Sequence, residues 1–132
     1  MSFLDLNLND VPELEVLADG EYELRVTGAE LKSYSNAKGA GQFISLSFDC
    51  PAEPNSKGIY HTLFLPNPGD DEKKRNNALR SIKYFCDAFG VDYSQGIDIE
   101  GLVGVTGWAI LKTESSEDYG DQNRIRRFVT GH

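Results

Sequence analysis

The chain of 132 residues lacks several features that would point to a particular class of protein. No stretch approaches the ~20 consecutive apolar residues that a membrane-spanning helix needs. No lysine or arginine precedes an apolar stretch near the N-terminus, so we expect no secretory signal. The sequence therefore predicts a cytoplasmic protein without a membrane partner.

Cysteine and histidine are also scarce. His61 and His132 lie far apart, and Cys50 and Cys86 form no closely spaced pair. No phosphate-binding loop or nucleophile elbow is present. We therefore expect no enzymatic activity, no cofactor and no metal site. Both cysteines lie in segments that are typical of a core, which predicts buried thiols in a reducing compartment.

Positive charge is missing from the first 23 residues, which hold seven acidic residues. The whole chain has a net charge of −8, and nucleic-acid binding normally requires a basic surface. From Leu24 onward, however, fourteen acidic residues face thirteen basic ones, so this part is nearly neutral. The charge therefore does not exclude an anionic ligand for residues 24–132.

The periodic segments that are present follow one order, which is three strands, one helix and two further strands. The strands are expected at Tyr22–Lys32, Gln42–Cys50, Gly58–Leu65, Leu102–Lys112 and Arg124–Val129, and the helix at Asp71–Phe89. This order predicts a mainly β fold, namely a five-stranded OB-fold barrel with one α-helix between strands 3 and 4. Residues 20–132 would form this domain. Residues 1–19 would form an acidic and apolar N-terminal arm that packs on the barrel or on a second subunit.

Local signals refine this expectation. Gly28 lies in mid-strand, where a bulge would bend the chain. Asp70 or Asp71 is expected to cap the helix, and Gly90 to end it. The polar, Gly-containing segments Lys32–Gly41 and Thr113–Asn123 are expected to be long hairpin loops.

Exposed aromatic rings beside cations are the chemistry by which proteins bind single-stranded nucleic acids. If Ile44, Leu46 and Phe48 face inward, Phe43 faces outward, and Tyr60 and Phe64 can join it. The candidate nucleic-acid-binding residues are Lys32, Tyr34, Lys38, Phe43, Tyr60, Trp108, Arg124 and Arg126. Strand alternation places Arg124 and Arg126 on one face and leaves Arg127 to pair with a carboxylate.

Other interpretations of the same residues stay open. Trp108 is equally suited to plugging a barrel end, and the N-terminal arm is able to cover Phe43 and Tyr60. The main alternative function is a protein-interaction or virion structural module that uses the aromatic surface for assembly. An OB-type oligosaccharide binder would also stack aromatic rings, but it would need no cations.

Several short motifs carry a family resemblance. They are Leu17-Ala-Asp-Gly-Glu-Tyr-Glu-Leu-Arg-Val26, Phe43-Ile-Ser-Leu-Ser-Phe48, Phe85-Cys-Asp-Ala-Phe-Gly-Val91, Leu102-Val-Gly104 and Gln122-Asn-Arg-Ile125. Over roughly Leu17–Gly131 the chain resembles phage-encoded single-stranded DNA-binding proteins with an OB-fold. The resemblance implies largely sequence-independent binding of single-stranded DNA in phage DNA replication or recombination. It also implies replication or recombination proteins as candidate partners, and a homodimer is a further expectation.

Overall fold

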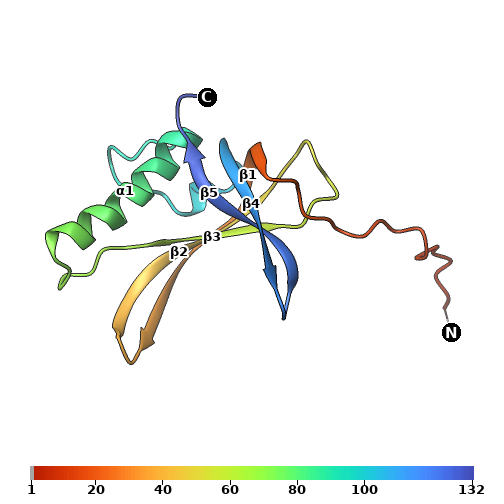
Figure 1. The fold of residues 1–132 in the computed structure, drawn as a ribbon, viewed down its shortest axis with the longest axis horizontal. Coiled ribbons are helices and arrows are strands. Elements are labelled where there is room, and N and C mark those ends of the chain that lie inside the picture. The colour runs from red at the N-terminus through yellow and green to blue at the C-terminus, as the bar shows by residue number, and fades with distance from the viewer. Residues whose placement is uncertain (1) are drawn as a thin grey trace.

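A computed structural model describes residues 2–132, so Met1 of the expected arm lies outside the described residues. The elements are β1 (Gly20–Asn36), β2 (Gly39–Asp49), β3 (Ile59–Phe64), α1 (Glu72–Phe89), a 3₁₀ turn (Glu100–Leu102), β4 (Thr106–Ser116) and β5 (Gly120–Val129) (Figure 1). The strands form one antiparallel sheet in the order β3-β2-β1-β4-β5. The mainly β class, the five strands and the position of the helix are confirmed.

Strand β1 joins the two halves of the sheet. Its first residues, 20–25, pair with β4, and its residues 25–36 pair with β2. The register shifts between Val26 and Gly28, which confirms the predicted bulge. No backbone ladder within residues 2–132 joins β3 to β5, although the rings of His61 and Phe128 meet at a centroid distance of 5.2 Å. The sheet is therefore not closed, and the barrel and the OB-fold stay predictions.

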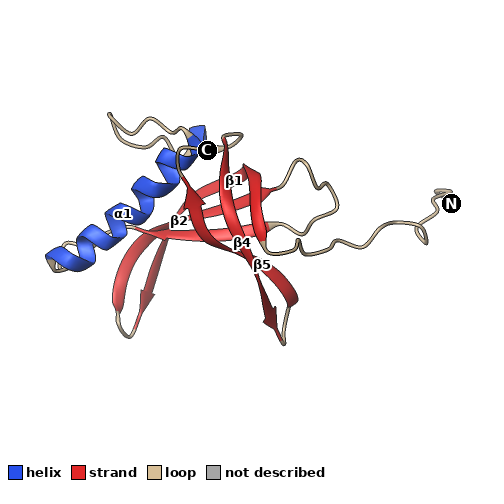
Figure 2. Cartoon of the chain, turned by 45° about the horizontal axis from the view of Figure 1, so that its top comes forward, coloured by secondary structure: helices blue, strands red, loops and turns tan. Residues whose placement is uncertain are grey.

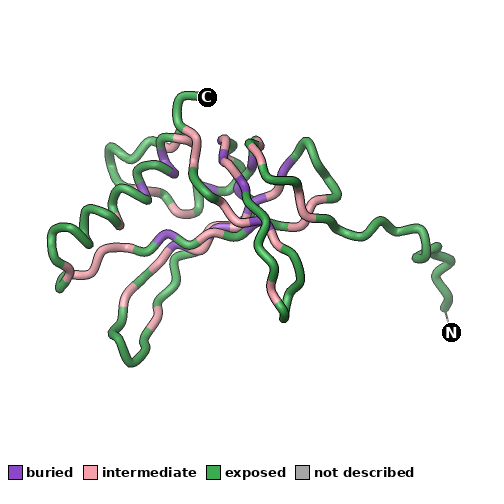
Figure 3. Tube along the Cα trace, viewed as in Figure 1, coloured by how far each residue is buried: buried purple, intermediate pink, exposed green. Residues whose placement is uncertain are grey.

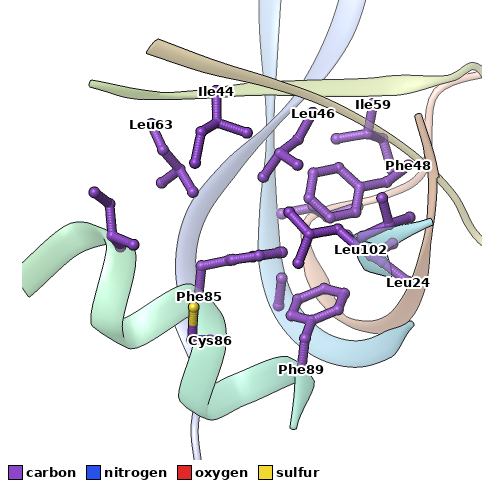
Figure 4. Close-up of a cluster of buried hydrophobic side chains, with 14 of the residues drawn as sticks. Leu24, Ile44, Leu46, Phe48, Ile59, Leu63, Phe85, Cys86, Phe89 and Leu102 are labelled. Atoms are coloured by element: carbon purple, nitrogen blue, oxygen red, sulfur yellow. The ribbon is translucent and has the colours of Figure 1, made fainter. Parts of the chain in front are cut away.

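The core lies between one face of this sheet and α1 (Figure 4). The predicted inward set of β2, which includes Ile44, Leu46 and Phe48, is buried. On β3 the inward residues include Ile59 and Leu63, so Tyr60 and Phe64 face outward. Both cysteines are free and buried as predicted, and burial raises the pKa of each thiol.

Helix α1 has the expected caps. The Asp71 carboxylate accepts a hydrogen bond from the Lys74 N–H at 2.8 Å, which settles the choice between Asp70 and Asp71. Gly90 ends the helix at φ 66°, in the left-handed region that favours glycine. Leu79, three residues before the buried Ile82, is 41% exposed, because it borders an open groove with Leu31, Ile44 and Leu65 rather than the closed core.

The prediction of two long hairpin loops is wrong. The β1–β2 ladder continues to the pair Asn36 and Gly39, and the β4–β5 ladder continues to Ser116 and Gly120. Two long hairpins therefore project from the same side of the sheet (Figure 2). Continued antiparallel pairing satisfies backbone N–H and C=O groups that a loop would leave to water, so polar strands persist beyond the core. The fourth strand also begins at Thr106 rather than Leu102, because Leu102 ends the 3₁₀ turn.

The N-terminal arm is irregular, as expected, but most of it does not pack on the sheet. Residues 2–14, called the free arm below, are exposed throughout, and Phe3 is 87% exposed (Figure 3). Contact with the domain begins at Glu15, which forms a β-bridge with Ser56. The backbone N–H of Leu17 donates to Asn123 Oδ1 at 2.8 Å, and Asn123 Nδ2 donates to the Leu17 carbonyl at 2.9 Å.

We expect the substitution Asn123→Ala to lower the free energy of unfolding by about 1–3 kcal/mol, because the part-buried N–H of Leu17 would lose its partner. The Leu17 carbonyl would keep only the longer hydrogen bond from Thr113 Oγ1, at 3.4 Å. Urea unfolding followed by circular dichroism measures this change. Gln122→Ala, at the adjacent half-buried position whose side chain makes no hydrogen bond among residues 2–132, should cost less than about 1 kcal/mol. Equal losses in the two variants would contradict the role of this amide as a clamp.

Candidate nucleic-acid interface

The outer face of the sheet gathers three aromatic rings from three strands. Phe43 of β2 lies directly opposite Phe64 of β3, and Tyr34 of β1 lies two residues along from the partner of Phe43. The ring centroids of Tyr34 and Phe43 are 6.2 Å apart, those of Tyr34 and Phe64 5.9 Å, and those of Phe43 and Phe64 5.8 Å. We call these three residues the aromatic cluster. Phe64 is 56% exposed, so the cluster offers ring surface to a ligand.

The absence of a side chain at Gly41 leaves room for the ring of Tyr34. Gly41 is the direct cross-strand partner of Tyr34, and a Cβ atom there would lie 2.7 Å from the Tyr34 hydroxyl oxygen and 2.9 Å from ring carbon Cζ. The tyrosine ring therefore lies over the bare backbone of β2. Any larger residue at position 41 would push the tip of the Tyr34 side chain away from its present position.

A depression of about 500 Å³ lies against this cluster. Its lining contains all three rings, two lysines from distant elements and two amides; these are Tyr34, Phe43, Phe64, Lys38, Lys74, Asn36 and Asn67, together with Gly39 and Ala40. Lys38 comes from the tip of the β1–β2 hairpin, and Lys74 from the first turn of α1. Flat rings, ammonium groups and amides thus meet in one place.

The lysines near the cluster are only weakly engaged with acids. Lys74 Nζ lies 3.4 Å from Asp70, and Lys32 Nζ lies 3.6 Å from Glu30, with both lysine side chains well exposed. Lys38 has no carboxylate within 4.0 Å among residues 2–132. The exposed pair of Lys32 and Glu30 contributes at most about 1 kcal/mol, so an anionic ligand can replace it at little cost. The Asp70 side chain is only 8% exposed, but it also accepts a hydrogen bond from the backbone N–H of Asn67 and so keeps a partner when Lys74 contacts a ligand.

Tyr60 shares the outer face but stands apart from the aromatic cluster. It lies four residues before Phe64 on β3, roughly 13 Å along the strand, and is 62% exposed. Its partner across the ladder is Ser47, and its hydroxyl end lies near Gly58. Neither residue supplies a second ring, so Tyr60 is a single exposed ring on the edge strand.

Trp108 lies far from the aromatic cluster and has one ring face covered. Its cross-strand partner on β1 is Glu23, eleven residues and roughly 35 Å of strand before Tyr34. The His132 ring stacks on Trp108 with a centroid distance of 3.7 Å and an angle of 6°. His132 Nε2 also lies 3.2 Å from the Glu21 carboxylate. A base can stack on this face of Trp108 only after His132 has moved.

We expect His132→Ala to increase the quenching of Trp108 fluorescence by acrylamide, because the substitution uncovers one face of the indole. Trp108 is the only tryptophan, so the signal has a single source. Thr130→Ala, at an exposed position of the same segment, is the control and should leave the quenching constant unchanged. An unchanged constant in His132→Ala would show that the stack does not persist in solution.

The arginines of β5 are arranged by a bulge that strand alternation did not reveal. Arg124 lies opposite Lys112, and Arg127 lies opposite Ile110, with Arg126 as the extra residue between the two registers. The bulge therefore brings Arg127 to the face of Arg124. The expected carboxylate partner of Arg127 is absent within residues 2–132, whereas Arg124 and Lys112 both approach Glu114, at 4.0 and 3.7 Å.

The structure thus brings together only some of the predicted site residues. Tyr34, Lys38 and Phe43 share the depression, and Lys32 lies beside Phe43 in the ladder. Tyr60, Trp108, Arg124 and Arg126 lie elsewhere on β3, β4 and β5. Phe64 was named only as a ring that could join Phe43, and Lys74 was not among the candidate residues. The shortness of the segment between β3 and α1 could have indicated the position of Lys74, because it keeps the first helical turn close to the end of β3.

Residues 2–132 contain no helix that is long and apolar enough to span a membrane. They also contain no group of three or more histidine, cysteine, aspartate or glutamate side chains arranged to hold a metal ion. Comparison with models of protein families gives no match, and comparison with curated protein sequences gives none either. The function must therefore be inferred from the residues themselves.

Proposed function

We propose that this protein binds single-stranded DNA on the outer face of β1, β2 and β3 with little sequence preference. The aromatic cluster beside Lys38 and Lys74 supports this proposal most directly. Bases would stack on the rings of the cluster, and the lysines would neutralise neighbouring phosphates. Stacking tolerates every base, because each one has a flat face, and this explains the expected lack of sequence preference.

The proposal includes the OB-fold. In such folds the face formed by strands 2 and 3, flanked by the hairpins that join strands 1 to 2 and strands 4 to 5, binds oligonucleotides. Here the aromatic cluster lies on β1, β2 and β3 between two long hairpins. Lys112, Arg124 and Arg127 on the β4–β5 hairpin would extend the phosphate path. Together with the family resemblance, this favours a role in phage DNA replication or recombination.

Binding of a labelled oligo-dT at a series of salt concentrations tests the proposal. We expect measurable affinity that falls as salt rises, because each neutralised phosphate releases a counterion, with a slope of about 0.7 per contact in log–log form. Affinity that ignores salt, or no affinity at low salt, would overturn the proposal. Competition with oligo-U of equal length then shows whether the sugar matters, and competition with duplex DNA shows whether unpaired bases are required.

An oligosaccharide-binding function predicts a different response. Stacking of sugars needs the rings but not the cations, so neutral glycans should compete for the site and Lys38→Glu should have no effect. For single-stranded DNA, Lys38→Glu should weaken binding, and glycans should not compete. The pair of measurements therefore separates the two functions.

A further inference from the structure

An apolar groove of about 560 Å³ lies on the side of the molecule that carries α1. Its lining comes from three parts of the chain, namely Leu79 and Ile82 of α1, Leu31 and Leu65 at or beside the sheet, and residues of the segment 93–99. Lys83 is the one charged residue among those described that line it. Leu31 and Leu79 are both more than two-fifths exposed, so this surface is open to solvent. A groove with this apolar lining is able to receive apolar side chains of another segment.

Helix α1 carries two basic residues, Arg75 and Lys83, on the side that borders the groove. Arg75, Leu79 and Lys83 are spaced four residues apart, so they form one row along α1. Lys83 is paired with Asp87 at 2.8 Å, and Arg75 has no carboxylate within 4.0 Å among residues 2–132. An occupant with apolar side chains and acidic neighbours would match this side of α1.

The free arm has this composition. Its apolar residues Phe3, Leu4, Leu6, Leu8, Val11 and Leu14 are each more than half exposed. Its charged residues are Asp5, Asp10 and Glu13, and no lysine or arginine interrupts them. Leu4, Leu6 and Leu8 alternate with acidic and amide side chains, and the whole segment, when extended, spans roughly 40 Å.

We propose that the free arm of one copy of this chain binds in the apolar groove of a second copy. The arm leaves the domain at the end remote from α1 (Figures 1 and 2). The bridge between Glu15 and Ser56 and the two hydrogen bonds between Leu17 and Asn123 fix its point of departure. The arm therefore points away from its own groove and toward a neighbouring molecule.

This contact joins two different surfaces, so each copy keeps one arm and one groove available. Repetition gives an open chain of subunits or a ring rather than a closed two-fold dimer. The inference does not depend on DNA, because neither the groove nor the free arm includes a residue of the aromatic cluster. It replaces the expected homodimer by a head-to-tail assembly.

Sedimentation velocity of the full chain without DNA tests the proposal. We expect the wild type to associate increasingly as its concentration is raised. An arm variant with Leu4→Ser, Leu6→Ser and Leu8→Ser should sediment as a monomer, as should a groove variant with Leu79→Glu. An equimolar mixture of the two variants should form dimers and nothing larger, because the groove variant supplies the only intact arm and the arm variant the only intact groove.

A wild type that stays monomeric over the whole concentration range would overturn the proposal. This result is also the one expected if the arm folds back onto its own groove or binds an unrelated protein. Association that survives in both variants, or a mixture that forms no dimer, would overturn it as well. These outcomes leave the oligo-dT titration unaffected, so failure here is distinct from failure of the proposed function.

A charge reversal provides a second groove variant if Leu79→Glu fails to fold. Arg75→Glu should weaken association about tenfold or more at low salt, because it places an acid beside the acidic arm. Lys73→Glu is the matched control, since it makes the same change on the same helix but lies ~160° round from Arg75. Equal effects of the two substitutions would show that only the net charge of the protein matters. They would contradict binding of the free arm in the groove.

Discussion

A variant with Phe43→Ala and Phe64→Ala should bind oligo-dT at least about a hundredfold more weakly than the wild type. Each stacked base is worth about 1–3 kcal/mol in alanine substitutions, and a tenfold change in affinity corresponds to about 1.4 kcal/mol. The two rings are in contact, with centroids 5.8 Å apart, so their effects should not simply add. Fluorescence anisotropy at fixed salt measures the loss, alongside each single variant.

The salt dependence shows which interaction has been lost. Removing rings removes no phosphate contact, so the slope of log affinity against log salt should stay as in the wild type. Lys74→Ala should instead lower that slope by about the amount that one phosphate contact contributes, while leaving stacking intact. Tyr84→Ala removes an exposed ring from α1, outside the depression, and should leave affinity unchanged. A double phenylalanine variant that binds like the wild type would contradict stacking on this face.

Both phenylalanines can be removed without loss of the domain, because they lie on the outer face. The core is formed by the opposite face of the same strands, through residues such as Ile44 and Leu63. Circular dichroism spectra of the variants should therefore match that of the wild type. This separation of the two faces follows from the two-residue period of a strand.

Periodicity was sufficient to predict the elements and most of the core. The alternation of Ile44, Leu46 and Phe48 identified the buried face of β2, and the signals at Asp71 and Gly90 marked the helix ends. These features are local, since a few neighbouring residues determine them. The hairpin lengths were missed because serine and glycine are typical of loops, although an antiparallel partner can equally hold them in a ladder.

The candidate site depends on register, which no single segment reveals. Phe64 meets Phe43 only because β2 and β3 pair at these positions, and Lys74 approaches only because α1 begins close to the end of β3. The bulge in β5 likewise moves Arg127 to the face of Arg124. A shift of one residue in any of these ladders would send the side chains to the other face. Sequence reasoning therefore supplied the candidate residues but not their grouping.

The other large effect concerns stability. We expect Phe85→Ala to lower the free energy of unfolding by about 3–5 kcal/mol, the usual cost of removing a buried aromatic ring. Phe85 is 1% exposed, and its ring contacts those of Phe48 at 6.3 Å, Phe89 at 4.9 Å and Phe128 at 5.5 Å between centroids. These partners come from β2, α1 and β5, so one side chain joins the helix to both halves of the sheet.

The loss of the Phe85 ring should also weaken both of the proposed binding activities. Helix α1 carries Lys74 beside the aromatic cluster and Leu79 in the apolar groove, so a loosened helix should weaken both oligo-dT binding and self-association. Urea unfolding followed by Trp108 fluorescence measures the stability. Leu79→Ala truncates an exposed residue of the same helix and should cost less than about 1 kcal/mol. Similar losses for the two variants would mean that Phe85 does not anchor α1 to the sheet.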